Sequence, residues 1–340
     1  MPAMPAFDDQ IRAMPKVELH VHLEGSIQPA TLLALARRHD IPLLANTVEG
    51  LRAWYTFTDF PHFIEIYKTI SACLRTPDDI ELIAREFLAG QAAQNIRYSE
   101  VTYTAFTHYA TKGLSFVDQL AALNRARVWA EAELGVSMGL IIDIERTVTP
   151  DEGLLVADWV IGALGQGVVA LGLGGPELGY PPERFAAAFD RALAAGAPRV
   201  PHAGETAGPA SIWGALRSLH AQRIGHGVRC LEDPALVAEL RDRQIPLEVC
   251  PTSNVCLHVV PSMAAHMLPR LLAEGLTVTL NSDDPPMFNT TLTGEYLAAA
   301  HTFGLSLADL RQLVLNAAQA SLLPTEKKAI LIHELLPTSR

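Results

Sequence analysis

The first strong pattern in the chain is a strict alternation of apolar and polar residues from Lys16 to Glu24. A period of two is typical of a half-buried strand. The apolar face would carry Val17, Leu19, Val21 and Leu23, and the polar face Lys16, Glu18, His20, His22 and Glu24. Because His20 and His22 would lie roughly 7 Å apart along one face, their imidazoles can lean together and share one metal ion. The other interpretation is a solvated strand face that happens to hold two histidines.

Seven further apolar runs, each ending in a polar or glycine-rich turn, predict seven more strands. They span Ile96–Tyr103, Val136–Asp143, Val168–Gly175, Arg199–Gly204, Arg223–Gly227, Pro246–Pro251 and Thr277–Asp284. Helical periodicity occupies Asp118–Leu134, Pro182–Ala195, Ile212–His220, Pro234–Arg243 and Met263–Ala273. Eight strands alternating with helices predict an α/β fold, the closed parallel (β/α)₈ TIM barrel, for which about 250 residues are typical.

At 340 residues the chain is longer than such a barrel requires, and most of the surplus lies in the first connection. About 70 residues separate the opening strand from Ile96, enough for extra helices over the barrel mouth. Within this connection, the aromatic-rich stretch 56–64 contains Phe60 and Phe63. These rings fit either the core of an extra helix or a hydrophobic lid, and in a lid they would contact a substrate.

The remaining sequence suggests a simple domain organisation. We expect residues 1–14 to form a loose N-terminal lead-in and residues 15–340 to form a single domain, since we find no repeat, low-complexity tract or linker. The formal net charge of −11 argues against binding to nucleic acid or to an anionic membrane. We find neither a membrane-spanning run nor a signal peptide. Four cysteines without C-x-x-C spacing are typical of a reduced, cytoplasmic protein.

Reactive side chains fall at the carboxyl ends of four predicted strands, the ends that form the active-site face of such barrels. The stretches are His20-Val21-His22, His202-Ala203-Gly204-Glu205, Gly225-His226-Gly227 and Asn281-Ser282-Asp283-Asp284-Pro285. Three histidines and one carboxylate suit a divalent transition metal, with Zn²⁺ the leading candidate. The ligands would be His20, His22, His202 and one of Asp283 or Asp284.

The chemistry of the neighbouring residues follows from such a metal. Because a catalytic Zn²⁺ lowers the pKa of a bound water toward neutrality, Glu205 can take a proton from that water and pass it on as a general acid/base. His226, between two glycines, can orient the attacking oxygen, and the second aspartate can hold a substrate nitrogen or His226. Each residue also has a structural interpretation: His226 as a strand histidine, Glu205 as a helix-cap partner and Asp283–Pro285 as a turn. We treat the other histidines as ordinary: His39, His62, His108, His220, His258, His266, His301 and His333.

Five ordered motifs resemble those of the adenosine deaminase family, and the resemblance runs from about Pro15 to about Leu322. The motifs are His20-Val-His22-Leu-Glu-Gly, His202-Ala-Gly-Glu205, Arg223-Ile-Gly-His226-Gly, Cys250-Pro-Thr-Ser-Asn254 and Asn281-Ser-Asp283-Asp284-Pro285. The family is a zinc-dependent (β/α)₈ barrel that replaces the 6-amino group of a purine with oxygen and releases ammonia. The resemblance therefore implies an enzyme whose partners are a small purine nucleoside and water.

The resemblance also implies roles for individual residues. It implies one zinc ion on His20, His22, His202 and Asp283. It assigns the proton shuttle to purine N1 to Glu205, and the orientation of the attacking hydroxide to His226. Asp284 would contact N7, and Gly175 would lie against N3. Because the fourth strand ends in glycines and offers no lysine, a single metal is expected.

Two positions bear on the substrate. At the position of Glu24, adenosine-specific members usually have an aspartate that reaches the ribose 5′-hydroxyl. At the position of Gly225, adenine deaminases commonly have an aspartate. Other stretches, among them Gly174–Glu177, resemble the branch that acts on 6-amino-6-deoxyfutalosine in menaquinone synthesis. This substrate is an adenosine analogue with an acidic aromatic group at its 5′-end. We expect a 6-aminopurine nucleoside deaminase acting on adenosine, deoxyadenosine or this analogue. The alternatives are an adenine deaminase, a non-purine metal-dependent amidohydrolase and a catalytically silent barrel.

Overall fold

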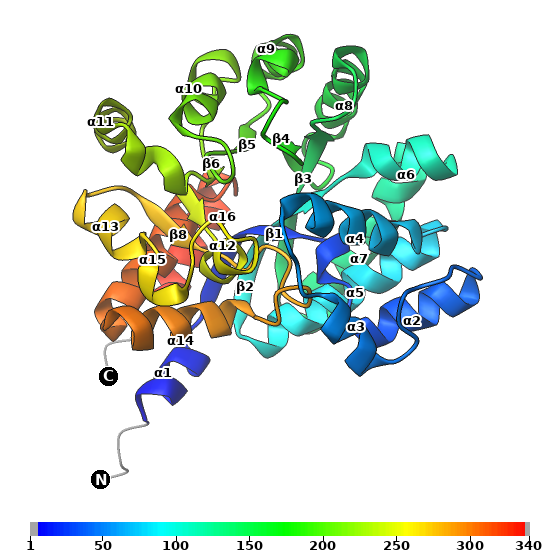
Figure 1. Ribbon diagram of the computed structural model, residues 1–340, viewed down its shortest axis with the longest axis horizontal. Coiled ribbons are helices and arrows are strands. Elements are labelled where there is room, and N and C mark those ends of the chain that lie inside the picture. Colours follow the sequence, from blue (N-terminus) through cyan, green and yellow to red (C-terminus); the bar gives the residue numbers. More distant parts are fainter. Residues whose placement is uncertain (1–5, 337–340) are drawn as a thin grey trace.

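The computed structural model describes residues 6–336, and these form a barrel of eight parallel strands surrounded by helices (Figure 1). The strands hydrogen-bond in chain order, so the predicted (β/α)₈ fold is confirmed. They are β1 (Lys16–His22), β2 (Ile96–Tyr103), β3 (Ser137–Glu145), β4 (Val168–Gly174), β5 (Arg199–Ala203), β6 (Ile224–His226), β7 (Leu247–Val249) and β8 (Val278–Leu280).

The first and last strands meet just beyond the end of β8, at a bridge between Val21 and Asp283. The backbone N–H of His22 donates to the carbonyl of Asp283 at 2.9 Å, and the N–H of Asp283 donates to the carbonyl of His20 at 3.1 Å. This closure brings the two histidines of β1 next to an aspartate more than 250 residues away in the chain.

The helices follow the predicted order. They are α1 (Phe7–Ala13), α2 (Pro29–Arg38), α3 (Val48–Trp54), α4 (Phe60–Ala72), α5 (Pro77–Ala93), α6 (Ala105–Lys112), α7 (Phe116–Leu134), α8 (Pro150–Ala163), α9 (Ala186–Ala194), α10 (Pro209–Ser218), α11 (Pro234–Asp242), α12 (Pro251–Cys256), α13 (Leu268–Ala273), α14 (Leu292–Phe303), α15 (Leu307–Ala320) and α16 (Thr325–Leu335). Short 3₁₀ turns occur at η1 (Glu24–Ser26), η2 (Pro182–Phe185), η3 (Val228–Glu232) and η4 (Met263–Ala265). Among residues 6–336, no helix has the length and apolarity needed to cross a membrane.

Strand β1 differs from the predicted half-buried strand in two ways. Every residue from Lys16 to Val21 is buried, because the face away from the helices points into the barrel rather than to solvent. The alternation is also broken by a β-bulge. Glu18 pairs with Ser99 and Val21 with Val101, so β1 advances three residues where β2 advances two. The N–H groups of Leu19 and His20 both donate to Oδ1 of Asn281, at 2.8 and 3.1 Å. Glu18 consequently bonds to Gln91 of helix α5, while His20 points into the barrel mouth.

The first connection contains the predicted extra helices, α2 to α4, before α5 leads into β2. Thr76 caps α5 through a reciprocal capping box with Asp79. At the N-terminus, helix α1 occupies half of the segment for which the sequence predicts a loose lead-in; residues 1–5 of that segment lie outside the described part. The helix is ordered because Ile11 is fully buried and α1 packs against α14 and α15.

Candidate metal and catalytic site

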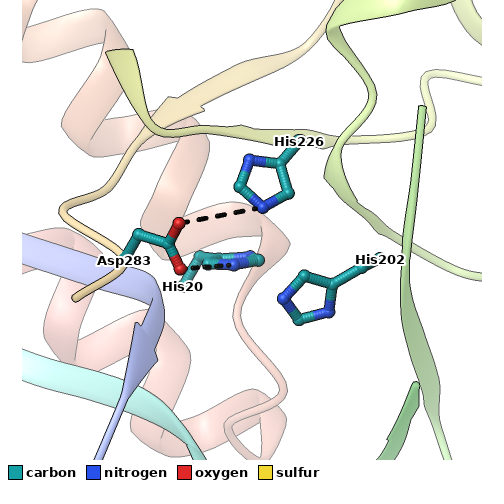
Figure 2. Close-up of side chains that lie close together, drawn as sticks. All are labelled: His20, His202, His226 and Asp283. Carbon is teal, nitrogen blue, oxygen red and sulfur yellow. Dashed lines mark ion pairs between the residues drawn. The ribbon is translucent and has the colours of Figure 1, made fainter. Parts of the chain in front are cut away.

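Four side chains from β1, β5, β6 and the end of β8 converge at the barrel mouth. The potential ligand atoms of His20, His202, His226 and Asp283 all lie within 4.8 Å of one another, and all four side chains are buried (Figure 2). His22 adjoins this group, with Nε2 3.3 Å from Oδ1 of Asp283. The structure therefore brings together the residues singled out at the predicted strand ends.

His20 is held by a carboxylate on its outer side. Its Nδ1 lies 2.9 Å from Oε2 of Glu248, and Oε1 of the same carboxylate accepts a 2.6 Å hydrogen bond from Nε of Arg223. Because a carboxylate can only accept here, Nδ1 of His20 carries a proton and Nε2 is the nitrogen that faces the cluster. Burial lowers the pKa of His20, but the attraction of Asp283 and Glu248 outweighs burial and raises the pKa to about 9, so a cation bound at Nε2 would take the place of a second proton. The same negative charges would favour a bound cation.

His202 presents a second lone pair to the cluster. Its Nδ1 donates to the carbonyl of Leu173 at 2.9 Å, which leaves Nε2 unprotonated in the neutral ring. This Nε2 lies only 3.1 Å from Nε2 of His22. Burial, together with the neighbouring imidazoles, holds the pKa of His202 well below its usual value. Two ring nitrogens at this separation need a proton or a cation close to both.

The two aspartates after β8 have different environments. Asp283 adopts a left-handed φ of 64° and accepts a 2.7 Å hydrogen bond from Ser253 on Oδ2. Burial raises its pKa, but the bonds to His20 and His22 prevail and hold the pKa well below the usual value. Burial and the charge of Asp283 instead raise the pKa of Asp284 well above its usual value. The raised pKa favours the protonated form of Asp284, and its side chain packs so closely on Gly25 that a Cβ there would lie 1.6 Å from Oδ1.

Glu205 lies in the loop after β5 and is buried. Its Oε1 has no hydrogen-bond partner, and burial together with the charges of Asp283 and Glu177 raises its pKa well above the usual value. The raised pKa favours a protonated Glu205, which can donate a proton. The helix-cap interpretation does not apply, because α10 begins at Pro209 and its N-cap, Gly208, makes no side-chain cap.

His226 completes the cluster from β6 with a left-handed φ of 59°. Its Nε2 lies 3.8 Å from Oε2 of Glu205 and 3.9 Å from Oδ2 of Asp283. Burial is the main cause of a pKa lowered to about 4, so the ring is neutral. The preceding Gly225 is required here, since a Cβ at that position would lie 2.8 Å from Cε1 of His20.

A cavity with about 750 Å³ of empty volume, part of it open to solvent, lies over the cluster. The cavity lining includes the predicted residues His22, Glu24, Phe60, Phe63, Gly175, His202, Glu205, His226, Asp283 and Asp284. Phe63 is also buried against Phe288, with ring centroids 5.6 Å apart, so the aromatic stretch is both core and cavity wall.

Glu24 lies in the 3₁₀ turn after β1, rather than on the polar face of the strand. Its Oε1 accepts from the backbone N–H of Thr104 at 3.1 Å and from Nε2 of His108 at 3.0 Å, and Oε2 accepts from the Tyr67 hydroxyl at 3.3 Å. Burial raises the pKa of Glu24, but the bond to His108 reverses the effect and keeps it below the usual value. His108, which the sequence analysis treats as ordinary, thus anchors a cavity-lining carboxylate.

Two other residues that line the cavity were not predicted from the sequence. Asp143 is buried, and burial is the main cause of a pKa raised to about 6. It is the last residue of the predicted third strand. The position of reactive residues at strand ends, which identified the other site residues, could therefore have identified Asp143. Tyr67 lies on α4, far from any strand end, and no sequence motif marks it.

The donor set fits a divalent metal. Nε2 of His20 is buried without a hydrogen-bond partner, although Asp283 Oδ1 is 3.4 Å away. Nε2 of His202 and Nε2 of His22 face the same space. Neutral imidazole nitrogens and one carboxylate oxygen are the ligands that such metals bind in hydrolytic sites. The fold and the site thus define a metal-dependent hydrolase barrel.

Comparisons with known proteins place the chain within this class. The sequence model of a family described as adenosine deaminase matches residues 15–337. An aminodeoxyfutalosine deaminase from Streptomyces coelicolor is 41% identical over 332 residues, covering 96% of this chain and 84% of the relative. An adenine deaminase from Trichlorobacter lovleyi is 40% identical, covering 97% and 94%.

Solved structures show the same similarity. An adenine deaminase from Arthrobacter aurescens superposes with a TM-score of 0.90 at 35% identity, covering 95% of this chain and 98% of that chain. An amidohydrolase from Burkholderia ambifaria, solved with bound zinc, also gives a TM-score of 0.90, at 28% identity, covering 98% and 93%. The chain belongs to the adenosine deaminase family and is a hydrolytic deaminase.

Proposed function

We propose that the chain is a zinc-dependent deaminase of 6-aminopurine nucleosides, with adenosine, deoxyadenosine or 6-amino-6-deoxyfutalosine as the physiological substrate. The observation that carries this proposal is that two buried carboxyl groups, each with one oxygen that lacks a hydrogen-bond partner, share one cavity with the metal-type cluster; the oxygens are Oε1 of Glu205 and Oδ1 of Asp284. Burial and neighbouring negative charge raise the pKa of both groups, which favours their protonated, hydrogen-bond-donating forms. Ring nitrogens of a purine are acceptors, so donors are what such a ring requires.

The proposed metal ligands are His20, His22, His202 and Asp283. A zinc ion there would lower the pKa of a bound water and supply the nucleophile near neutral pH. The zinc-containing neighbour and the nitrogen-rich donor set support zinc as the metal.

The remaining roles belong to the residues around the cavity. Glu205 protonates N1, which makes C6 easier to attack, then takes a proton from the attacking water and passes it to the leaving amine. Protonated Asp284 donates to N7, and the backbone of Gly175 lies against N3. His226 donates a hydrogen bond to the attacking oxygen and orients it toward C6.

Two features favour a nucleoside over the free base. The close approach of His20 to Gly225 excludes the aspartate that adenine deaminases commonly have there. The cavity also extends from the cluster to one face of α4, where Phe60, Phe63 and Lys68 line it. Lys68 is exposed and makes no ion pair within residues 6–336, so it is available to an acidic group at the 5′-end of a substrate.

A substrate panel tests this proposal. Adenosine, 2′-deoxyadenosine, adenine and 6-amino-6-deoxyfutalosine are compared by kcat/KM, following the loss of 6-aminopurine absorbance and the release of ammonia. We expect one of the nucleosides to rank first. An enzyme that prefers adenine would be an adenine deaminase, and one inactive on the whole panel would favour a non-purine amidohydrolase.

A further inference from the structure

Behind His226 lies a buried chain of polar groups that the proposed mechanism does not use. Nδ1 of His226 is 3.5 Å from Nδ2 of Asn254, and Oδ1 of Asn254 is 3.1 Å from Nε2 of His266. This series of hydrogen bonds ends at the backbone N–H of Leu268, 3.0 Å from Nδ1 of His266. All three side chains are buried, and no motif analysed above gives His266 a role.

The direction of each hydrogen bond in this series follows from the last one, which joins His266 to the backbone of Leu268. A backbone N–H can only donate, so Nδ1 of His266 accepts. Burial lowers the pKa of His266 to about 4, so the ring is neutral and its single proton is on Nε2. That N–H donates to Oδ1 of Asn254, which fixes the orientation of the amide and turns its NH₂ group toward Nδ1 of His226.

His226 therefore differs from the two histidines beside it. Glu248 and the Leu173 carbonyl hold the protons of His20 and His202 on Nδ1, leaving lone pairs on Nε2. At His226 the Asn254 amide faces Nδ1, so the proton lies on Nε2, the nitrogen nearest Glu205 and Asp283. An N–H cannot bind a metal, but it can donate a hydrogen bond.

We propose that His266 and Asn254 are positioning residues that fix His226 in its Nε2–H tautomer. The ring then presents a hydrogen-bond donor to the cluster and cannot act as a metal ligand. The distances from His226 to the other potential ligand atoms, taken alone, would allow it to bind the same ion. The role of this donor in catalysis, a hydrogen bond to the attacking oxygen, rests on the proposed function. The tautomer itself does not depend on the proposed function.

Nitrogen NMR of protein labelled with ¹⁵N-histidine tests the tautomer directly. The His226 ring signals are assigned by their absence in His226→Gln, and we expect a protonated Nε2 and an unprotonated Nδ1. Asn254→Asp keeps the shape of the side chain but replaces the donor with an acceptor. It should move the proton of His226 to Nδ1. A purely structural role for Asn254 predicts no such reversal.

A pair of substitutions at the outer end provides a second test. His266→Leu removes the donor to Asn254 and should leave the His226 ring with mixed tautomers. His266→Gln retains an N–H that reaches Asn254 and should restore the wild-type signals. Loss of the outer partner of a metal ligand typically costs about 10–100-fold. By analogy we expect kcat of His266→Leu to fall about 10-fold, with KM nearly unchanged and with partial rescue by glutamine.

His301→Leu is the control, because His301 pairs with Asp8 on the surface, far from the cluster. It should change neither the His226 signals nor kcat. The proposal is overturned if wild-type His226 carries its proton on Nδ1, or if neither Asn254→Asp nor His266→Leu alters the ring signals. Because the NMR result needs no turnover, it stands even if the purine substrate proves wrong.

Discussion

The carboxylate of Glu177 accepts a hydrogen bond from the backbone N–H of Glu205, with 2.9 Å between Oε2 and the nitrogen. The same oxygen accepts from the N–H groups of Thr206 and Ala207 at 2.7 and 2.8 Å, and Oε1 accepts from that of Gly204 at 2.7 Å. One buried carboxylate thus fixes the loop that carries the proposed proton shuttle. Glu177 also contributes charge that raises the pKa of Glu205 after the larger effect of burial.

Glu205→Gln should remove turnover while keeping the metal. Glutamine has nearly the same shape but cannot transfer a proton, and general acid–base groups contribute roughly 10²–10⁴-fold to rate. Metal analysis and kcat on adenosine check this together. Substantial remaining activity, with zinc bound, would remove Glu205 from the shuttle role.

Glu177→Gln should weaken both the loop and catalysis. A glutamine turns one NH₂ group toward backbone donors, and each lost bond to a charged acceptor costs about 1.5–3 kcal/mol. We expect a lower Tm, a lower kcat and unchanged zinc content. Glu183→Gln is the control, since Glu183 is exposed on the same connection. Equal kcat values for the two variants would contradict a positioning role for Glu177.

Glu248→Gln should lower zinc affinity. Glu248 orients the lone pair of His20 while Arg223 holds its other oxygen. Loss of such a partner typically costs about 10–100-fold in metal affinity. Competition with a chelator measures the change, and Glu239→Gln, an exposed glutamate paired with Arg243, is the control. Chelated wild-type enzyme should be inactive and should recover when zinc is added; equal affinities in both variants would exclude this role for Glu248.

Much of this site is predictable from the sequence, because the strand ends that bear His20, His202 and Asp283 are marked by local apolar runs. The parts that were missed depend on contacts between distant segments. The bulge in β1 is created by Asn281, which accepts from two successive N–H groups more than 260 residues away, and alternation cannot reveal it. The bonds from His108 to Glu24 and from His266 to Asn254 likewise join separate helices and turns.

Lys68→Met should affect acidic substrates selectively. Methionine keeps the length of the side chain but removes the charge at the cavity wall. Because Lys68 is exposed, we expect a modest loss of roughly 2–5-fold in kcat/KM for 6-amino-6-deoxyfutalosine. The value for adenosine, which has no acidic group, should change much less. Equal losses for both substrates would show that Lys68 does not recognise the acid.

Glu295→Gln should change the pH dependence of stability. Glu295 lies in the first turn of α14 and is buried, with Oε2 3.1 Å from the N–H of Thr252 and Oε1 2.6 Å from the Thr290 hydroxyl. Burial is the main cause that raises its pKa from 4.5 to about 7. A carboxyl whose pKa is higher in the folded state favours folding when protonated, so this contribution is present below about pH 4.5 and is lost as the pH rises to about 7.

Glutamine reproduces the protonated form, accepting from Thr252 and donating to Thr290, but it does not titrate. The free energy of unfolding of the wild type should therefore fall by about 2–3 kcal/mol relative to Glu295→Gln between pH 5 and pH 8. Urea denaturation of both proteins at the two pH values measures this difference, in which the titration of other groups largely cancels. A constant difference would mean that Glu295 is already ionised at pH 5, and that its two hydrogen bonds compensate for its burial.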